Sequence, residues 1–273
     1  MSLPLLLLFS LLLLSSSIEF GDDLKVDLQL VKHQACPHNA KSKWNRKIEF
    51  EGGNGKKGPK LEEAEEGRKG CYYIGGRVNV LQEFSGNFSI YLEIRRSASS
   101  LPERCVKQNG DGCGGIGSCL YCDACTSFGS AIGVNAQLLL NGKSIECADG
   151  LRPGVYDHLK LKFCLPDIDE ILETQGLNKK TLLSLIQSED GQSFGSLSLF
   201  STVFIFDVDV RRQMASQSRI EKIYREENNK KSLFKDEALP SDVYWSMPFN
   251  ALIKKQSLYI GCHKIYGNIQ LKS

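Results

Sequence analysis

The residues of this chain with the clearest chemistry are its ten cysteines, six of which fall between Cys105 and Cys147. Thiolates spaced two residues apart can hold a zinc ion or an iron–sulfur cluster. In an oxidising compartment the same cysteines close into disulfides, and glycine lets the backbone turn tightly between them. The centre of the span reads Gly112-Cys113-Gly114-Gly115-Ile116-Gly117-Ser118-Cys119-Leu120-Tyr121-Cys122-Asp123-Ala124-Cys125.

The first residues of the chain favour disulfides over a metal. A mostly apolar run from Leu5 to Leu14 is followed by small residues, Ser15 to Ser17, which is typical of a secretory signal peptide over 1–17. The basic residues that usually precede such a run are missing, and the run is shorter than the roughly 20 residues of a membrane span. All ten cysteines lie beyond it, so the sequence predicts a disulfide framework in a protein of the secretory pathway.

The composition and length limit the classes of binding partner and the number of domains. The formal net charge is +2, with 34 basic and 32 acidic residues, and no concentrated basic face is evident for binding nucleic acid. A length of 273 residues allows one substantial domain with extensions, or two small domains. The sequon Asn87-Phe88-Ser89 predicts glycosylation at Asn87, which should face solvent.

Two alternating segments predict half-buried strands. Phe88, Ile90, Leu92 and Ile94 alternate with more polar residues, and Leu159, Leu161 and Phe163 alternate with lysines and Cys164. Asn141-Gly142 between two apolar runs predicts a hairpin, because this pair adopts the positive φ angles of a tight turn. Further strands are expected around Val78 to Val80, at 250–253 and at 261–271. Together these predict an all-β fold, an antiparallel sandwich or cup.

The remaining segments are less regular. Residues 18–70 lack a periodic pattern and are interpreted as an extended N-terminal arm, with a solvated charge run over 61–70. Within 171–245, Leu182 to Ile186 has helical spacing, 197–210 is typical of a strand, and 218–231 predicts an exposed helix.

With these segments in view, the chain resembles the ganglioside GM2 activator family, secreted lysosomal lipid-transfer proteins of the ML-like group. The resemblance rests on Gly86-Asn87-Phe88-Ser89-Ile90, the Ile116-Gly117-Ser118-Cys119 motif, Cys147 with Gly154-Val155-Tyr156 and 163–167, and Gly261-Cys262-His263-Lys264-Ile265. It covers about 71–170 and 246–273, and implies a disulfide-rich β-cup over 71–273 interrupted by an insertion at 171–245. Cys36, Cys105, Cys122 and Cys164 have no counterpart in the family.

The resemblance also implies a set of disulfide partners. These are Cys113 with Cys119, Cys125 with Cys147, and an N-terminal cysteine with Cys262; spacing to Asn87 favours Cys71 for the last, with Cys36 as the alternative. We expect Cys105 to pair with Cys122, and Cys164 to pair with whichever N-terminal cysteine is left.

Residues that could act in catalysis are scattered. The four histidines, His33, His38, His158 and His263, have no triad or metal spacing, and His158 and His263 are expected to be structural or exposed. The pairs Asp167/Asp169 and Asp207/Asp209 could bind calcium or move protons, but solvated strand ends are the better interpretation. We therefore predict no enzyme, no cofactor and no metal.

Lipid binding asks for an apolar cavity, which alternating strands can line. Moving a chain of about 16 carbons out of a bilayer costs on the order of 13 kcal/mol, and candidate lining residues are Phe88, Ile90, Leu92, Ile94, Leu159, Leu161 and Phe163. The resemblance implies a carrier that extracts a glycolipid or phospholipid from a membrane surface and presents it to a lysosomal glycosidase. The insertion would then cover the mouth of the cup or touch the membrane. The alternative is a secreted interaction module that binds a protein and has a filled core.

Overall fold

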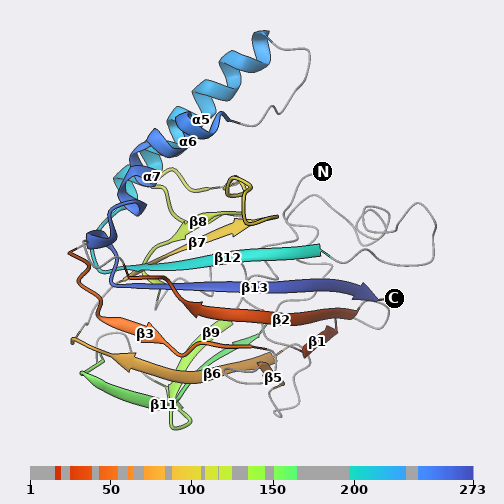
Figure 1. Ribbon diagram of the computed structural model, residues 1–273, viewed down its shortest axis with the longest axis vertical. Coiled ribbons are helices and arrows are strands. Elements are labelled where there is room, and N and C mark those ends of the chain that lie inside the picture. The colour runs from red at the N-terminus through yellow and green to blue at the C-terminus, as the bar shows by residue number, and fades with distance from the viewer. Residues whose placement is uncertain are drawn as a thin grey trace.

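A computed structural model shows two antiparallel β-sheets with helices packed on one of them (Figure 1). The structure describes residues 16–19, 25–38, 43–54, 61–63, 71–83, 88–105, 108–115, 117–124, 135–144, 151–164, 197–231 and 239–272. Three disulfides lie within these ranges. The predicted all-β, disulfide-rich sandwich with a partly helical segment is therefore confirmed.

Seven strands form the first sheet, here called sheet A, in the order β1-β2-β13-β12-β7-β8 with β4 beside β2. Its central strands β2, β13, β12 and β7 run side by side across the molecule (Figure 1). The bounds are β1 Ser16–Glu19, β2 Lys25–Ala35, β4 Gly53–Asn54, β7 Ser89–Arg95, β8 Cys119–Tyr121, β12 Leu197–Phe206 and β13 Gly261–Lys272.

Six strands form the second sheet, sheet B, in the order β10-β9-β11-β6-β3 with β5 beside β6. The bounds are β3 Ile48–Phe50, β5 Leu61–Glu63, β6 Cys71–Val80, β9 Asn135–Leu140, β10 Lys143–Ser144 and β11 Gly154–Cys164. Strands β9 and β10 are the predicted hairpin, and Asn141 and Gly142 at its turn have φ angles of 52° and 76°.

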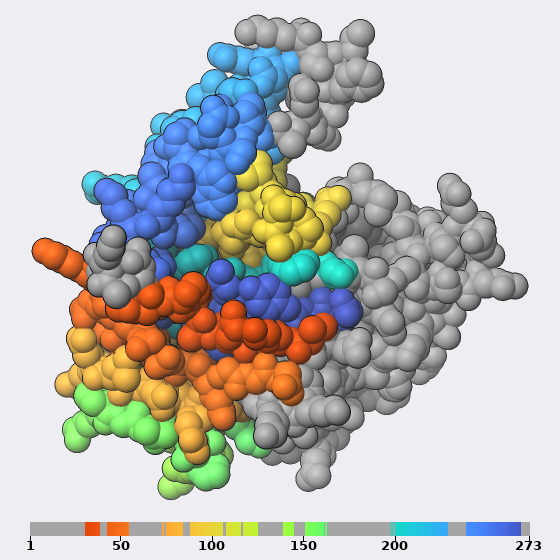
Figure 2. Space-filling view, viewed as in Figure 1, coloured from red at the N-terminus to blue at the C-terminus, as the bar shows by residue number. Residues whose placement is uncertain are grey.

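Three α-helices and a short 3₁₀ helix complete the described part. They are α5 Arg211–Lys231, α6 Ser241–Ser246, α7 Pro248–Ile253 and η3 Gln256–Leu258. Helix α5 confirms the helix predicted over 218–231 and starts earlier, where the Asp209 carboxylate accepts a hydrogen bond from the Arg211 amide at 3.0 Å. Figure 2 shows these helices packed against the chain that follows β7.

The strand predicted at 250–253 is wrong, because this segment belongs to helix α7. Pro248 occupies the first turn, where its fixed φ angle suits a helix and its missing amide costs nothing. Phe249 and Ile253, four residues apart, then fall on one buried face.

Two predicted boundaries also change. Part of the expected arm over 18–70 forms β2, which pairs with β13 in sheet A, so the sheets begin well before Cys71. The expected insertion at 171–245 contains β12, which lies between β7 and β13 near the middle of the same sheet. Both segments therefore belong to the sandwich itself.

The two faces of sheet A have different neighbours. Phe204 and Phe206 on β12 point towards the helices, where Phe206 and Phe249 have ring centres 5.8 Å apart. Ile205 points the other way and packs against Val78 and Val80 of sheet B. We call the side that faces sheet B the inner face.

The disulfides differ from the predicted set. Cys105 pairs with Cys119, and Cys113 pairs with Cys122. The predicted Cys113–Cys119 and Cys105–Cys122 pairs are therefore wrong. In this region Gly117 has a φ angle of 110°, and a Cβ there would lie 1.9 Å from the Arg104 carbonyl oxygen. This close approach requires glycine, and it brings the chain carrying Cys105 against the chain carrying Cys119.

The third disulfide joins Cys36 to Cys262, which is the alternative allowed for Cys262, so the favoured Cys71–Cys262 pair is wrong. The N-terminal cysteine left over is then Cys71. The register of β6 and β11 aligns Cys71 directly with Cys164. Cys125 and Cys147 lie outside the described residues.

Candidate functional site

The predicted cavity residues fall on the surfaces that face each other between the sheets. Ile90, Leu92 and Ile94 are cross-strand partners of Ile205, Val203 and Ser201 on β12, so they share the inner face of sheet A. Leu92 and Ile94 are buried.

On sheet B, Leu159 is buried in the same apolar cluster against which Phe88 packs. Leu161 and Phe163 follow Leu159 at the two-residue period of β11, which puts their positions on the same face of the strand. Their side chains lie outside the described part of the structure.

At one end of the sandwich the two sheets pack directly against each other. A Cβ added at Gly261 would lie only 2.6 Å from the Cγ2 atom of Ile48, so the sheets touch there. We call this cluster the closed end; its buried members are Ile48, Val78, Val80, Leu151, Leu159, Ile205 and Ile260.

Polar side chains follow the closed end along the inner face of sheet A. His263 is the cross-strand partner of Val203, which lies two residues before Ile205 on β12. Ser201 lies two residues before Val203, further from the closed end. His33 on β2 is the cross-strand partner of Ile265, the residue that also faces Ser201. We call Ser201, His33 and His263 the polar trio. All three side chains are at least 94% buried.

The two histidine rings form a hydrogen bond with each other through one nitrogen each, and the second nitrogen of each ring has no described partner. His33 Nδ1 lies 2.9 Å from His263 Nε2, and the Phe50 ring of sheet B packs edge-on against His263 with ring centres 5.8 Å apart. The opposite nitrogens, His33 Nε2 and His263 Nδ1, find no hydrogen-bond partner in the described part of the chain, nor does Ser201 Oγ. Three buried polar atoms on one face that have no partner among the described residues are unusual, because such an atom costs free energy unless something binds it.

Burial keeps both imidazoles neutral. It lowers the pKa of His263 to about 4, and the neighbouring His33 ring acts in the same direction. Burial also lowers the pKa of His33, against the opposing effect of the Glu51 carboxylate. In a neutral pair, one ring donates to the other, so one of the two outer nitrogens is a donor and the other an acceptor in either tautomer. The pair therefore offers both kinds of hydrogen bond at once.

Sequence reasoning did not find this site. His33 and His263 are 230 residues apart, and His33 lies in the segment interpreted as an arm. Only the pairing of β2 with β13 brings the two rings together. His263 is structural and buried, in line with one of the two expectations for it, whereas His158 is exposed.

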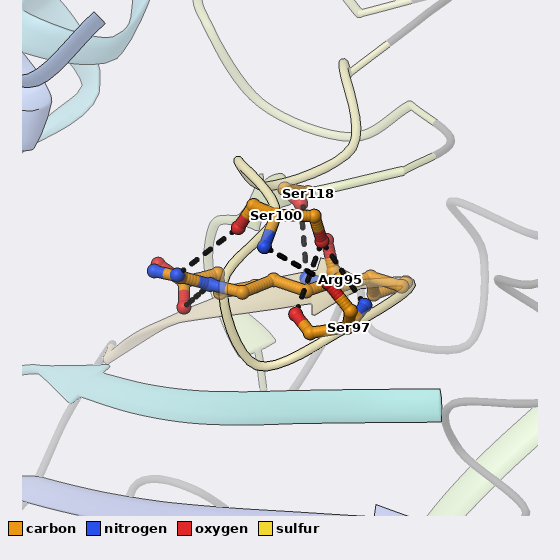
Figure 3. Close-up of polar contacts among 6 residues, drawn as sticks. Arg95, Ser97, Ser100 and Ser118 are labelled. Carbon is orange, nitrogen blue, oxygen red and sulfur yellow. Dashed lines mark hydrogen bonds and ion pairs between the residues drawn. The ribbon is translucent and has the colours of Figure 1, made fainter. Parts of the chain in front are cut away.

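A second polar cluster lies at the end of β7 and is satisfied internally (Figure 3). The Ser118 hydroxyl accepts the Ile94 amide at 2.9 Å and donates to the Ile94 carbonyl at 3.2 Å. Ser97 and Ser100 bind each other's amides through their hydroxyls, and Arg95 donates to the Ser100 carbonyl at 3.2 Å. This network fixes the turn after β7 against the cysteine region, which is a structural role.

The opposite face of β7 meets the helices instead of solvent. Arg95 Nε donates to Glu93 Oε1 at 2.8 Å, and the Arg95 and Lys254 cations each lie 5.4 Å from the ring centre of Trp245. Tyr91 is buried on this face, and burial raises its pKa well above the usual value. The expected polar, solvent-facing alternation of this strand is therefore wrong, because α5–α7 form a further layer over it.

The acidic pairs have separate roles. Asp207 forms an ion pair with Lys47 at 2.6 Å, and Asp209 binds the first turn of α5. The ranges that the structure describes contain no group of three or more His, Cys, Asp or Glu side chains able to hold a metal ion. Asp167, Asp169, Asn87 and Leu182 to Ile186 lie outside these ranges.

Comparison with known proteins places the chain in no family. No family model matches the sequence, and no curated protein matches it. Within the described residues, none of the helices combines the length and apolar character that a membrane crossing requires.

Proposed function

We propose that this protein is a secreted or lysosomal lipid carrier that holds one lipid between its two sheets. The main observation in support is the inner face of sheet A, which presents aliphatic side chains together with three buried polar atoms that have no described partner. A core that merely fills space would be expected to hydrogen-bond its buried polar groups. A ligand that is largely apolar and carries a polar group would satisfy both parts of this surface.

The resemblance to the ganglioside activator family gives this carrier its task. In this proposal the protein takes a glycolipid or phospholipid from a membrane surface and presents it to a partner such as a lysosomal glycosidase. The three disulfides support an oxidising compartment, and Asn87 would carry a glycan. The chain itself performs no covalent step.

The alternative is a disulfide-rich module that binds another protein and has a filled core. Direct packing at the closed end favours it, since Ile48, Ile205 and Ile260 leave no room between the sheets there. The two functions differ in what lies beyond the polar trio, away from the closed end.

Native mass spectrometry of the protein from a secretory host, followed by organic extraction, tests the proposal. We expect one lipid per chain, released when the disulfides are reduced. A bare protein mass, together with no uptake of labelled lipid from liposomes at neutral or acidic pH, would overturn the carrier and favour the protein-binding module.

A further inference from the structure

The polar trio differs from the rest of the inner face in what it can bind. Around it, Ile94, Val203 and Ile265 offer only hydrocarbon, whereas Ser201 Oγ, His33 Nε2 and His263 Nδ1 are polar and without a described partner. Ser201 and His263 are diagonal neighbours on paired strands, a spacing of about 7–8 Å or less. One small polar group of a ligand can lie within reach of both.

The charge around the trio argues against an anionic group. On the inner face of sheet A, residues 89–95, 200–206, 261–266 and 33–35 place no lysine or arginine, and the neighbouring carboxylate of Glu51 is negative. A phosphate or sulfate held there would be a buried charge that no cation on these stretches of the inner face could pair with. A neutral group avoids that cost.

The polar trio can both donate and accept hydrogen bonds. The histidine pair presents one donor and one acceptor, and the serine hydroxyl can act as either. A hydroxyl group is itself both donor and acceptor, so it can satisfy two of these atoms together. An ether or ester oxygen only accepts, and would leave the acceptor nitrogen unsatisfied.

From these three points we infer that Ser201 and the His33–His263 pair form a binding site for the uncharged hydroxyl group of an otherwise apolar ligand. This inference rests on the proposed lipid binding and narrows it: hydroxyl-bearing neutral lipids are favoured over lipids that would bury a phosphodiester. The ligand enters the inter-sheet space with a hydroxyl directed at the trio, and its hydrocarbon contacts the aliphatic residues on either side.

Three probes of equal chain length test the site: dodecan-1-ol, dodecyl methyl ether and dodecyl phosphate. Their affinities are measured by native mass spectrometry or calorimetry, below the concentrations at which they aggregate. For the unaltered protein we expect dodecan-1-ol to bind at least about tenfold more tightly than either other probe, because a lost partner leaves a buried polar atom unsatisfied.

Variants connect the preference to the trio. Ser201→Ala should abolish the preference for the alcohol, and Ser201→Thr, which keeps a hydroxyl, should retain it. The matched control is Ser198→Ala, an exposed serine on the same strand whose hydroxyl donates to Asn268 at 3.2 Å; it should leave all three affinities unchanged.

Three results would overturn the inference. Equal binding of all three probes in the unaltered protein and in Ser201→Ala would mean that the trio plays no part in binding, while lipid carriage would stand. Tighter binding of dodecyl phosphate would show that an anion is accepted. Binding of none of the probes would also reject the site, and lipid uptake from liposomes would then decide separately whether the protein is a carrier at all.

Discussion

At the scale of single residues, the buried histidine pair couples the stability of the protein to pH. Both His33 and His263 are buried among aliphatic and aromatic groups, so the folded state favours neutral rings. Unfolding exposes them to water, where each takes up a proton near its ordinary pKa of about 6.5. The unfolded chain therefore binds more protons than the folded one at mildly acidic pH.

The contribution of the neutral pair to the free energy of unfolding should therefore be complete above pH 6.5. It should decrease as the pH falls towards 4, the pKa of His263 in the folded protein. The contribution of His263 alone is about 3 kcal/mol at most. Among the described residues, the Glu51 carboxylate acts on His33, where it opposes the effect of burial on the pKa. Urea unfolding at a series of pH values with the disulfides intact measures this slope.

A double variant, His33→Leu with His263→Phe, isolates the effect, because replacing both partners by apolar groups avoids a new unsatisfied atom. Its stability should vary less between pH 4 and 6.5 than that of the unaltered protein. His158→Asn, which changes an exposed histidine, is the control and should leave the slope as it was. Identical slopes in the double variant and the unaltered protein would contradict this account.

At the scale of elements, β12 connects two layers of packing. Its Phe204 and Phe206 pack towards α7 and Tyr259, while Ile205 between them packs into the closed end. A strand covered on both sides needs apolar residues on both faces, which is why Phe204-Ile205-Phe206 is continuous instead of alternating. Removing 175–240 would therefore take out a central strand and prevent folding, which the interpretation of 171–245 as an insertion did not anticipate.

A milder test uses two residues near the end of the strand. Phe206 is fully buried against Phe249, so Phe206→Ala should lower the free energy of unfolding by about 3–5 kcal/mol. Val208 is 46% exposed, and Val208→Ala should change it by no more than about 0.5 kcal/mol. Denaturant titration of both variants checks the contrast, and similar losses would mean that the helical layer does not bury this face of sheet A.

Sequence patterns predicted individual strands and turns better than they predicted which other elements pack against them. The strand that carries Ile90, Leu92 and Ile94 on one face and the Asn141-Gly142 turn each depend on neighbouring residues, and both were confirmed. The burial of Glu93 on the other face depends on helices formed more than a hundred residues later, which no local period reveals. Likewise, nothing near His33 indicates that His263 is its neighbour.

At the scale of the whole molecule, the two ends of the chain are joined in sheet A. Strand β2 pairs with β13 over most of its length, and the Cys36–Cys262 disulfide lies where that pairing ends. The aligned cysteines are 226 residues apart in sequence, so their pairing could not be chosen from spacing. By contrast, the partners Cys113 and Cys122 are only 9 residues apart, and the choice there was among several close neighbours.

The two disulfides should differ in their effect on stability. A cross-link restricts the unfolded chain more when the loop that it closes is longer. Replacing Cys36 and Cys262 together by alanine should lower the free energy of unfolding by roughly 5 kcal/mol, against roughly 2.5 kcal/mol for the Cys113/Cys122 pair. Unfolding curves of the two double variants, with peptide mapping to verify the remaining bridges, measure the difference. A larger loss for Cys113/Cys122 would show that native packing in the glycine-rich region outweighs the restriction of the long loop.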